Sequence, residues 1–266
     1  MTHPTALTIA GSDPSGGAGI QADLKTFHAH GVYGTSVVTL LTAQNTLGVS
    51  AVQSASESMV DGQLRAVLSD MPPAAAKTGA LGSAPTIECL LARLEGSTFP
   101  LVVDPVMVST SGDSLLDADG RRALRRLFAR ATLITPNLPE AEALLGRAYA
   151  DPVDDARALL DLGTNAVLLK GGHASGAALD VLVSHEGVQR LESPRVDTKH
   201  THGTGCSLSA AITARLALGE GLGDAVRCAK AWVYGAIASA PGLGAGHGPI
   251  NHFFPIPTRA APVKTG

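Results

Sequence analysis

Leu7-Thr8-Ile9-Ala10-Gly11-Ser12-Asp13-Pro14-Ser15-Gly16-Gly17-Ala18-Gly19 is an apolar run that leads into a glycine-rich turn. The apolar residues 7–10 predict a short strand, and Gly11 ends it. A helix is expected over residues 19–30, with Gly31 placed as a residue that commonly follows a helix C-terminus. Strand, turn and helix in this order form one unit of an α/β fold, and the rest of the chain repeats it.

The same alternation continues to the C-terminal part of the chain. Strands rich in Val, Leu and Ile are expected at 36–42, 75–79, 101–104, 133–135 and 166–170. Helices are expected at 59–69, 85–94, 120–129, from 139 onward, and at 154–162, 207–218 and 223–240, with a hairpin at 180–183 and 187–195. This order predicts an α/β fold with a mainly parallel central sheet and helices on both faces. We expect one domain over residues 1–257 and a frayed C-terminal tail over 258–266.

Composition limits the classes of partner. With 266 residues, of which 45% are hydrophobic, the chain is long enough to bury a large core. A net charge of −3 and an aromatic content of 3% argue against nucleic acid and against an anionic membrane surface, so a small-molecule substrate is expected. Cys89, Cys206 and Cys228 have no paired spacing, and no secretory signal or membrane span is evident, which together predict a cytoplasmic protein.

Several polar residues follow the predicted strands, where ligands of open α/β sheets bind. Asp104 ends an apolar strand, and burying its carboxylate would be costly without a partner or a cation. Asn137 and Glu140 place oxygen atoms near one helix start, which suits hydrated Mg²⁺ beside nucleotide phosphates. Taken alone, the pair is better explained by ordinary helix capping. Lys170 is suited to contact a phosphate, or it is a solvated charge at the end of a strand.

The turn Gly203-Thr204-Gly205-Cys206 precedes a helix rich in Ala and Leu. Backbone N–H groups and the helix dipole favour an anion there, and a thiol at such a place usually has a lowered pKa. A plain tight connection with a buried, inert cysteine is the competing interpretation.

The first glycine-rich turn is neither a Walker loop nor a dinucleotide fingerprint, although its glycines let the backbone approach a small ligand closely. Asp23 lies in the following helix and is suited to bond a ligand hydroxyl or to support the helix start. Gln44 follows the second strand, and its amide offers a donor and an acceptor to an amino-substituted heteroaromatic ring. A hydrophilic loop is the alternative for Gln44.

Taken together, the motifs resemble those of hydroxymethylpyrimidine/phosphomethylpyrimidine kinases, a family of the ribokinase-like superfamily. The resemblance covers nearly the whole chain. The matching motifs lie at 10–27, 31–34, 42–46, 77–79, 103–107, 135–142, 170–173, 201–206 and 246–252.

The resemblance implies two ATP-dependent phosphorylations in thiamine biosynthesis. The first acts on 4-amino-5-hydroxymethyl-2-methylpyrimidine and the second on its monophosphate. By motif, the residues that would hold the pyrimidine are Asp23, Gln44, Gly11 and Ala18. Those that would organise ATP and Mg²⁺ are Asn137, Glu140, Asp104 and Lys170, with Glu140 and Asp104 acting on the metal largely through water or phosphate. The anion hole over the transferred phosphate would be Gly203, Thr204, Gly205 and Cys206.

Cys206 departs from the wider superfamily, in which many sugar kinases have an Asp at the equivalent turn as the catalytic base. We therefore hypothesise that Cys206, with a lowered pKa, is the general base for the substrate hydroxyl. Pyridoxal kinase of the same superfamily is the closest alternative function, and a non-catalytic pyrimidine sensor is an alternative of a different class. The resemblance is compatible with a homodimer. Residues 109–113 are suited to be a mobile flap, and the adenine site is expected near Ala229 and Val233.

Overall fold

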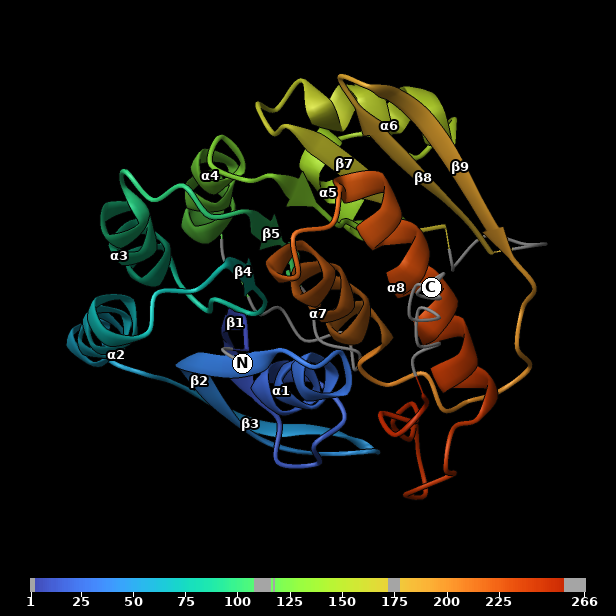
Figure 1. Ribbon diagram of the computed structural model, residues 1–266, viewed down its shortest axis with the longest axis horizontal. Coiled ribbons are helices and arrows are strands. Elements are labelled where there is room, and N and C mark those ends of the chain that lie inside the picture. Colours follow the sequence, from blue (N-terminus) through green and yellow to red (C-terminus); the bar gives the residue numbers. More distant parts are fainter. Residues whose placement is uncertain (1–2, 108–115, 117, 172–177, 256–266) are drawn as a thin grey trace, which may run out of the picture.

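The computed structural model describes residues 3–107, 116, 118–171 and 178–255. In these ranges nine strands form a single sheet in the order β3-β2-β1-β4-β5-β6-β7-β8-β9 (Figure 1). The strands are β1 (Thr5–Ser12), β2 (Tyr33–Asn45), β3 (Gly48–Ser54), β4 (Ala75–Thr78), β5 (Leu101–Val103), β6 (Leu133–Ile134), β7 (Ala166–Leu169), β8 (Ala178–Ser184) and β9 (Gly187–Ser193).

The six central strands, from β2 to β7 in spatial order, are parallel to one another. At the two edges the pairing is antiparallel, between β2 and β3 and between β7, β8 and β9. The prediction of a mainly parallel α/β sheet is therefore confirmed, as is the hairpin of β8 and β9.

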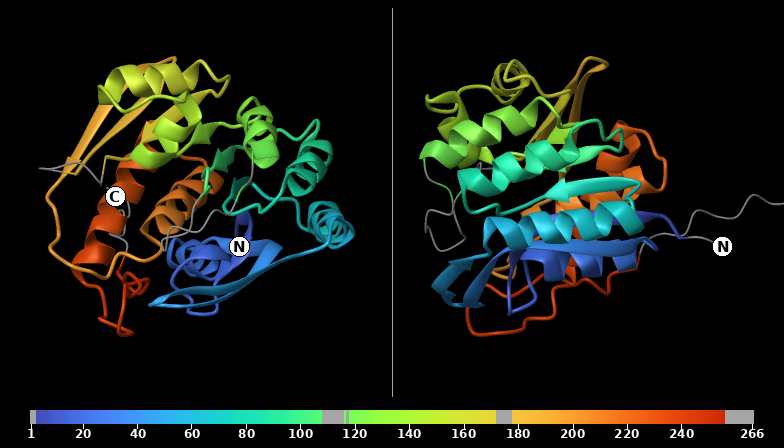
Figure 2. Two further views of the ribbon diagram at one scale, coloured as in Figure 1. Left: turned by 180° about the vertical axis from the view of Figure 1, so that it is seen from behind. Right: turned by 90° about the vertical axis from the view of Figure 1, so that its left-hand side faces the viewer.

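Helices cover both faces of the sheet, as predicted (Figures 1 and 2). One face packs against α2 (Glu57–Asp70), α3 (Ala84–Leu94), α4 (Ala118–Phe128), α5 (Leu138–Leu145) and α6 (Pro152–Leu160). The other packs against α1 (Gly19–Ala29), α7 (Thr204–Ala217) and α8 (Leu222–Ala238). Successive strand residues point to opposite faces, so Val103 belongs to the first apolar layer and Val102 to the second.

The second strand differs from the sequence-based expectation. It extends to Asn45 and forms a hairpin with β3, so Gln44 lies within a strand and not in a loop after one. β3 was not predicted, because most of its residues are exposed and it lacks the apolar alternation that marks a strand. The hairpin tip is held by the far end of the chain. Gly246 N–H donates to Thr46 Oγ1 at 3.2 Å and His247 N–H donates to Thr46 O at 2.9 Å.

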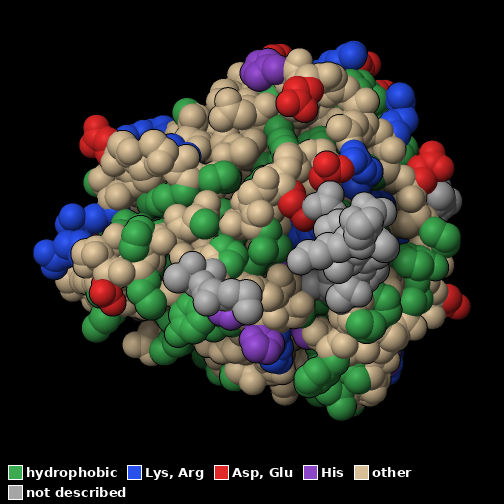
Figure 3. Space-filling view, in the orientation of Figure 1, with side chains coloured by type: hydrophobic (Ala, Val, Ile, Leu, Met, Phe, Trp, Pro, Cys, Tyr) green, Lys and Arg blue, Asp and Glu red, His purple; other side chains and the backbone are tan. Residues whose placement is uncertain are grey.

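The carboxyl ends of the six parallel strands share one edge of the sheet. Helices α1 and α7 both begin at this edge, which brings their first turns against the loops that follow β1, β5 and β7. None of the helices among the described residues is long and apolar enough to cross a membrane. On the face seen in Figure 3, acidic and basic side chains are interspersed.

Candidate functional site

Two glycine turns interlock at this edge. Gly203, the residue before α7, has φ +76°, and a Cβ there would lie 1.7 Å from Gly17 O in the β1–α1 loop. Gly19, the first residue of α1, has φ +57°, and its Cβ would lie 2.3 Å from Gly11 O. Only glycine fits either position, because the backbone is left-handed and another backbone segment occupies the side-chain space. The starts of α1 and α7 are therefore held against each other.

A charged cluster lies beside the start of α7. Lys170 Nζ donates to Asp104 Oδ1 at 3.1 Å, and Thr135 Oγ1 donates to the same oxygen at 3.0 Å. A Cβ on Gly205 would lie 3.3 Å from Lys170 Nζ, so the first turn of α7 adjoins the ammonium group. Burial alone would lower the pKa of Lys170, but Asp104 and Glu140 raise it above its ordinary value. Lys170 is thus a fixed positive charge next to helix N–H groups, a combination that attracts phosphate.

Glu140 is part of the same cluster and also caps α5. Asn137 Oδ1 accepts from Glu140 N–H at 2.9 Å, and Glu140 Oε2 accepts from Asn137 N–H at 2.8 Å, forming a capping box. Capping, the alternative interpretation of these two residues, is therefore present. Burial and the neighbouring Asp104 raise the pKa of Glu140 to about 7, although Lys170 opposes the shift.

The donor set is compatible with Mg²⁺. Among the described residues no group of three or more His, Cys, Asp or Glu side chains is arranged to hold a metal. Mg²⁺ at phosphate-transfer sites commonly uses one or two carboxylates, with water and phosphate completing the shell. Glu140 and Asp104 are two such carboxylates in mutual repulsion, which a cation would relieve.

Cys206 lies in the first turn of α7, where the sequence predicts it. The expected lowering of its pKa is wrong. Burial, helped by Asp23 and Asp104, raises the pKa of the Cys206 thiol to about 11, although Lys77 and the Gly19 N–H group oppose the shift. The helix start is not enough to ionise the thiol, because the half-buried Cys206 side chain has lost much of its hydration and lies near two carboxylates.

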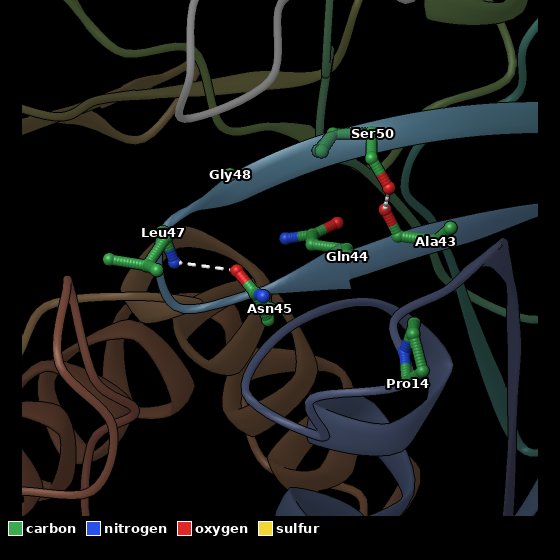
Figure 4. A pocket seen from close by; sticks show the side chains of 8 residues that line it. Pro14, Ala43, Gln44, Asn45, Leu47, Gly48 and Ser50 are labelled. Carbon is green, nitrogen blue, oxygen red and sulfur yellow. Dashed lines mark hydrogen bonds between the residues drawn. The ribbon is translucent and has the colours of Figure 1, made fainter.

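Gln44 lines an open hollow of about 550 Å³ formed by the β2–β3 hairpin and the β1–α1 loop (Figure 4). Pro14 lies across from the hairpin, and Leu47, Val49 and Ser50 complete this wall. Gly11 is buried next to the Leu40 side chain, and Ala18 lies at the entrance to α1, where its N–H donates to Asp13 Oδ2 at 2.8 Å.

Asp23 is not placed as expected. Its side chain has 0% exposed surface, Lys77 Nζ donates to Oδ1 at 2.8 Å, and Thr8 Oγ1 donates to Oδ2 at 2.6 Å. The carboxylate is fully buried, each of its oxygens accepts a hydrogen bond from the protein, and Asp23 is not among the residues that line the hollow beside Gln44. The role of Asp23 is to neutralise Lys77, because a buried lysine needs an anionic partner.

Three residues of the site have no role in the sequence-based interpretation. Asp13 and His202 form a buried contact in which Oδ2 and Nε2 are 2.8 Å apart, and Lys77 neutralises Asp23. A signal for Lys77 exists in the sequence, since a lysine directly after the apolar run at 74–76 requires a buried counter-charge. For Asp13 and His202, 189 residues apart, local sequence offers no such signal.

Some of the predicted segments cannot be compared with the structure, and two predicted residues lie away from the cluster described above. The flap at 109–113, the second half of the motif at 170–173 and the tail at 258–266 lie outside the described residues. Ala229 and Val233, both on α8, are 0% and 5% exposed and belong to the apolar layer between α8 and the sheet, so neither side chain offers open surface to an adenine ring. Thr204 is in the first turn of α7 as expected, with its hydroxyl donated to Thr201 O at 2.7 Å.

Comparison with known proteins gives consistent results. A family model described as phosphomethylpyrimidine kinase matches residues 13–251. A Staphylococcus aureus hydroxymethylpyrimidine/phosphomethylpyrimidine kinase is 46% identical over 256 residues, covering 93% of each chain. An ADP complex of Bacillus subtilis pyridoxal kinase superposes with a TM-score of 0.88 at 38% identity, covering 95% of this chain and 98% of that one. A Clostridium difficile phosphomethylpyrimidine kinase superposes with a TM-score of 0.78 at 44% identity, covering 88% of this chain and 99% of that one.

Proposed function

This chain belongs to the phosphomethylpyrimidine kinase family, and from that premise we propose how its site carries out two successive phosphoryl transfers. The enzyme is an ATP-using phosphotransferase with a ribokinase-like fold that acts in thiamine biosynthesis. The first acceptor is the hydroxymethyl group of 4-amino-5-hydroxymethyl-2-methylpyrimidine. The second is the phosphate of the product, which becomes a diphosphate.

The observation that carries the proposal is the meeting of Lys170, Asp104 and Gly205 at the start of α7. Phosphoryl transfer requires alignment of two oxygens and stabilisation of charge on the moving group, with little covalent participation by the protein. The N–H groups of the first turn of α7 would stabilise that charge without reorganisation, each worth about 3 kcal/mol when well aimed. Lys170 would contact the transferred phosphoryl oxygens.

The pyrimidine would occupy the hollow lined by Gln44, with its hydroxymethyl group directed toward Cys206. The Gln44 amide would pair with the ring. Gly11 and Ala18 are not among the residues that line this hollow, so they would act only through the backbone next to it. Asp23 supports this region through Lys77 and does not contact the ring directly.

Mg²⁺ would be held near Glu140 and Asp104, with Asn137 orienting Glu140 through the capping box. When bound it supplies charge neutralisation to the phosphates. With a pKa of about 7, Glu140 is partly protonated near neutral pH and would have to release its proton in order to hold a cation. Lys170 remains charged throughout, because Asp104 and Glu140 hold its pKa above the ordinary value.

Cys206 is proposed as the group that accepts the hydroxyl proton. With a pKa of about 11 the resting thiol is protonated at neutral pH, so a thiolate must form before it can act. Mg²⁺ held near Glu140 and Asp104 would add positive charge nearby and so lower this pKa, against the effect of burial, which raises it. In phosphoryl transfer the bond to the leaving group is largely broken before the new bond forms, so the hydroxyl proton leaves late. A thiolate that is present in only a small fraction of molecules, but is a strong base, is then sufficient. Replacement of Cys206 by Ala, assayed at saturating substrates, tests the role, and a kcat near that of the wild type would contradict it.

The function itself is tested by product analysis. Purified enzyme with the aminopyrimidine alcohol and ATP-Mg²⁺ should give first the monophosphate and then the diphosphate, with one ADP released for each transfer. Absence of ADP release would support the non-catalytic sensor. Accumulation of the monophosphate alone would contradict the second transfer.

Pyridoxal is the second candidate substrate, because the pyridoxal kinase of Bacillus subtilis shares 38% identity and nearly the whole fold. Comparing kcat/KM for the aminopyrimidine alcohol and for pyridoxal decides between them. We expect the aminopyrimidine to be preferred, since the Gln44 amide pairs with an amino group beside a ring nitrogen.

We further propose a cytoplasmic homodimer. The three cysteines are free thiols, which suits a reducing compartment. Tyr33, Leu41 and Leu47 on β2 and its hairpin are 57%, 54% and 73% exposed and supply apolar surface for a second copy. Light scattering of the purified protein would measure the mass in solution.

A further inference from the structure

The Gln44 carboxamide is the end point of a chain of hydrogen bonds that begins at Asp13 and passes through His202. Gln44 Nε2 and His202 Nε2 are 3.3 Å apart, and His202 Nε2 and Asp13 Oδ2 are 2.8 Å apart. One imidazole nitrogen therefore faces both a carboxylate and a carboxamide. Whether His202 Nε2 carries a hydrogen decides whether the oxygen or the NH₂ group of the Gln44 carboxamide can face it.

Asp13 is an ionised acceptor. Its carboxylate accepts from Ser15 N–H and Oγ, both at 2.9 Å, and from Ala18 N–H at 2.8 Å. Burial pushes the pKa of Asp13 upward, but the hydrogen bonds from His202, Ser15 and Ala18 outweigh it and lower the pKa. A carboxylate without a proton can only accept, so His202 Nε2 must carry a hydrogen in order to bond it. This holds whether the imidazole is neutral or charged.

The hydrogen on His202 Nε2 excludes a carboxamide NH₂ group as its neighbour, because two donors cannot bond each other. The carboxamide oxygen of Gln44 must face His202 instead, which a half-turn of the planar amide achieves. His202 Nε2–H then donates to both Asp13 and Gln44.

Thr42 leads to the same conclusion from the other side of the amide. Its Oγ1 donates its only hydrogen to Ser12 O at 2.9 Å, and it lies 3.3 Å from the remaining terminal atom of Gln44. A hydroxyl that has already donated can only accept, so this atom must be the NH₂ group. With oxygen toward His202 and nitrogen toward Thr42, every donor in the network meets an acceptor.

We propose that Asp13 and His202 are positioning residues that fix the direction of the Gln44 carboxamide and thereby select a ring with an amino group beside a ring nitrogen. This rests on the proposed function, in which Gln44 binds the pyrimidine. The amide keeps one N–H and one oxygen lone pair free, side by side, which matches an amino N–H next to a ring nitrogen. The amino group pairs on the His202 side and the ring nitrogen on the Thr42 side.

The test compares two substrates that differ only in the amino group, namely the aminopyrimidine alcohol and 5-hydroxymethyl-2-methylpyrimidine. The readout is the ratio of their kcat/KM values. His202→Phe should lower this ratio by about tenfold or more, since one oriented hydrogen bond is lost. His202→Gln, whose amide N–H can replace Nε2–H, should restore it.

The ratio separates positioning from general damage. His202 precedes Gly203, so a substitution that disturbs the α7 turn slows both substrates equally and leaves the ratio unchanged. The matched control is His252→Phe, because His252 is a half-buried histidine bonded to α7, through Ser207 Oγ at 3.1 Å, and is not bonded to Gln44. An unchanged ratio in His202→Phe, with the wild type discriminating, overturns the proposal.

A second measurement does not depend on activity. In histidine labelled with ¹⁵N, His202 Nε2 should show the shift of a protonated ring nitrogen, assigned by its loss in His202→Gln. An unprotonated Nε2 overturns the proposal. If His202→Phe does not fold, Thr42→Val tests the other end of the amide and should also lower the ratio. A wild type that phosphorylates neither pyrimidine refutes the proposed function, whereas the nitrogen shift still tests the direction of the amide.

Discussion

Lys77 and Asp23 form an ion pair in which neither side chain has exposed surface, with Nζ and Oδ1 2.8 Å apart. The pair is close enough to the Cys206 thiol to influence its pKa. Burial alone would lower the pKa of Lys77, but the negative charges of Asp23 and Asp104 hold it above its ordinary value. The buried charges next to the site therefore stabilise one another, and removing one of them leaves another without its counter-charge.

Removal of the lysine alone should be costly. Lys77→Met leaves Asp23 without a counter-charge in the core and should lower the free energy of unfolding by about 3–5 kcal/mol. Chemical denaturation measures it. The double variant Lys77→Met, Asp23→Leu should recover most of the loss. Arg126→Ala, which breaks an exposed pair with Glu88, is the control and should cost less than about 1 kcal/mol. A loss for Lys77→Met as small as that of the control would contradict a compensated core charge.

Glu140 should make stability depend on pH. Its folded-state pKa of about 7 lies above the ordinary 4.5, so the protonated carboxyl favours the folded state. This contribution is complete below about pH 4.5 and is lost as the pH rises through about 7, in total roughly 3 kcal/mol. Glu140→Gln keeps the capping box and should therefore gain stability over the wild type at pH 8 but not at pH 4. Denaturation at both pH values measures the difference, with Glu95→Gln as an exposed control. Equal differences at the two pH values would be inconsistent with the raised pKa.

The Cys206 thiol should react slowly with iodoacetamide at neutral pH. With a pKa of about 11 only on the order of one thiol in ten thousand is ionised at pH 7, and the rate should rise about tenfold per pH unit up to pH 10. Mass spectrometry of the peptide measures it, and the exposed Cys228 provides a reference in the same sample. A rate that levels off below pH 8 would show that the thiol is activated in the resting enzyme.

Lys170→Met should reduce kcat by about 10²–10³-fold while changing the KM for the pyrimidine little, because the charge acts on the transferred phosphate. Steady-state kinetics with each substrate saturating separates the two effects. Lys230 is the matched control, since it also pairs with a carboxylate at a strand, Asp180 Oδ2 at 2.7 Å, but not at the α7 turn. If Lys230→Met lowered kcat as much, a structural effect would explain both.

Gly203→Ala and Gly219→Ala form a matched pair. Both glycines have positive φ, +76° and +83°, but only Gly203 has backbone within the reach of a Cβ. Gly219→Ala should cost about 1 kcal/mol for the left-handed backbone alone. Gly203→Ala should cost several times more and abolish kinase activity, because α7 and the β1–α1 loop must separate. Thermal unfolding and activity measured on both variants check this.

Much of this architecture could be predicted from the sequence, because each central strand is an apolar run followed by a turn and an amphipathic helix. The grouping of Asp104 and Lys170 followed from the rule that parallel strands end at one edge. β3 could not be predicted, since its residues are mostly exposed and it is held as a strand only by its hydrogen bonds to β2. The burial of Asp23 depends on Lys77, 54 residues away, and the Cys206 pKa depends on how much water the fold excludes. Such properties arise from contacts between distant segments, which spacing along one chain does not reveal.

The contact of Thr46 with Gly246 and His247 has a consequence for how the enzyme is made. During vectorial synthesis the hairpin that carries Gln44 leaves the ribosome early, about two hundred residues before the segment that holds its tip. His202 likewise emerges long after Asp13. A nascent chain can therefore form its first strands and helices while remaining unable to recognise its ligand, and competence to bind is acquired only when translation has passed residue 247.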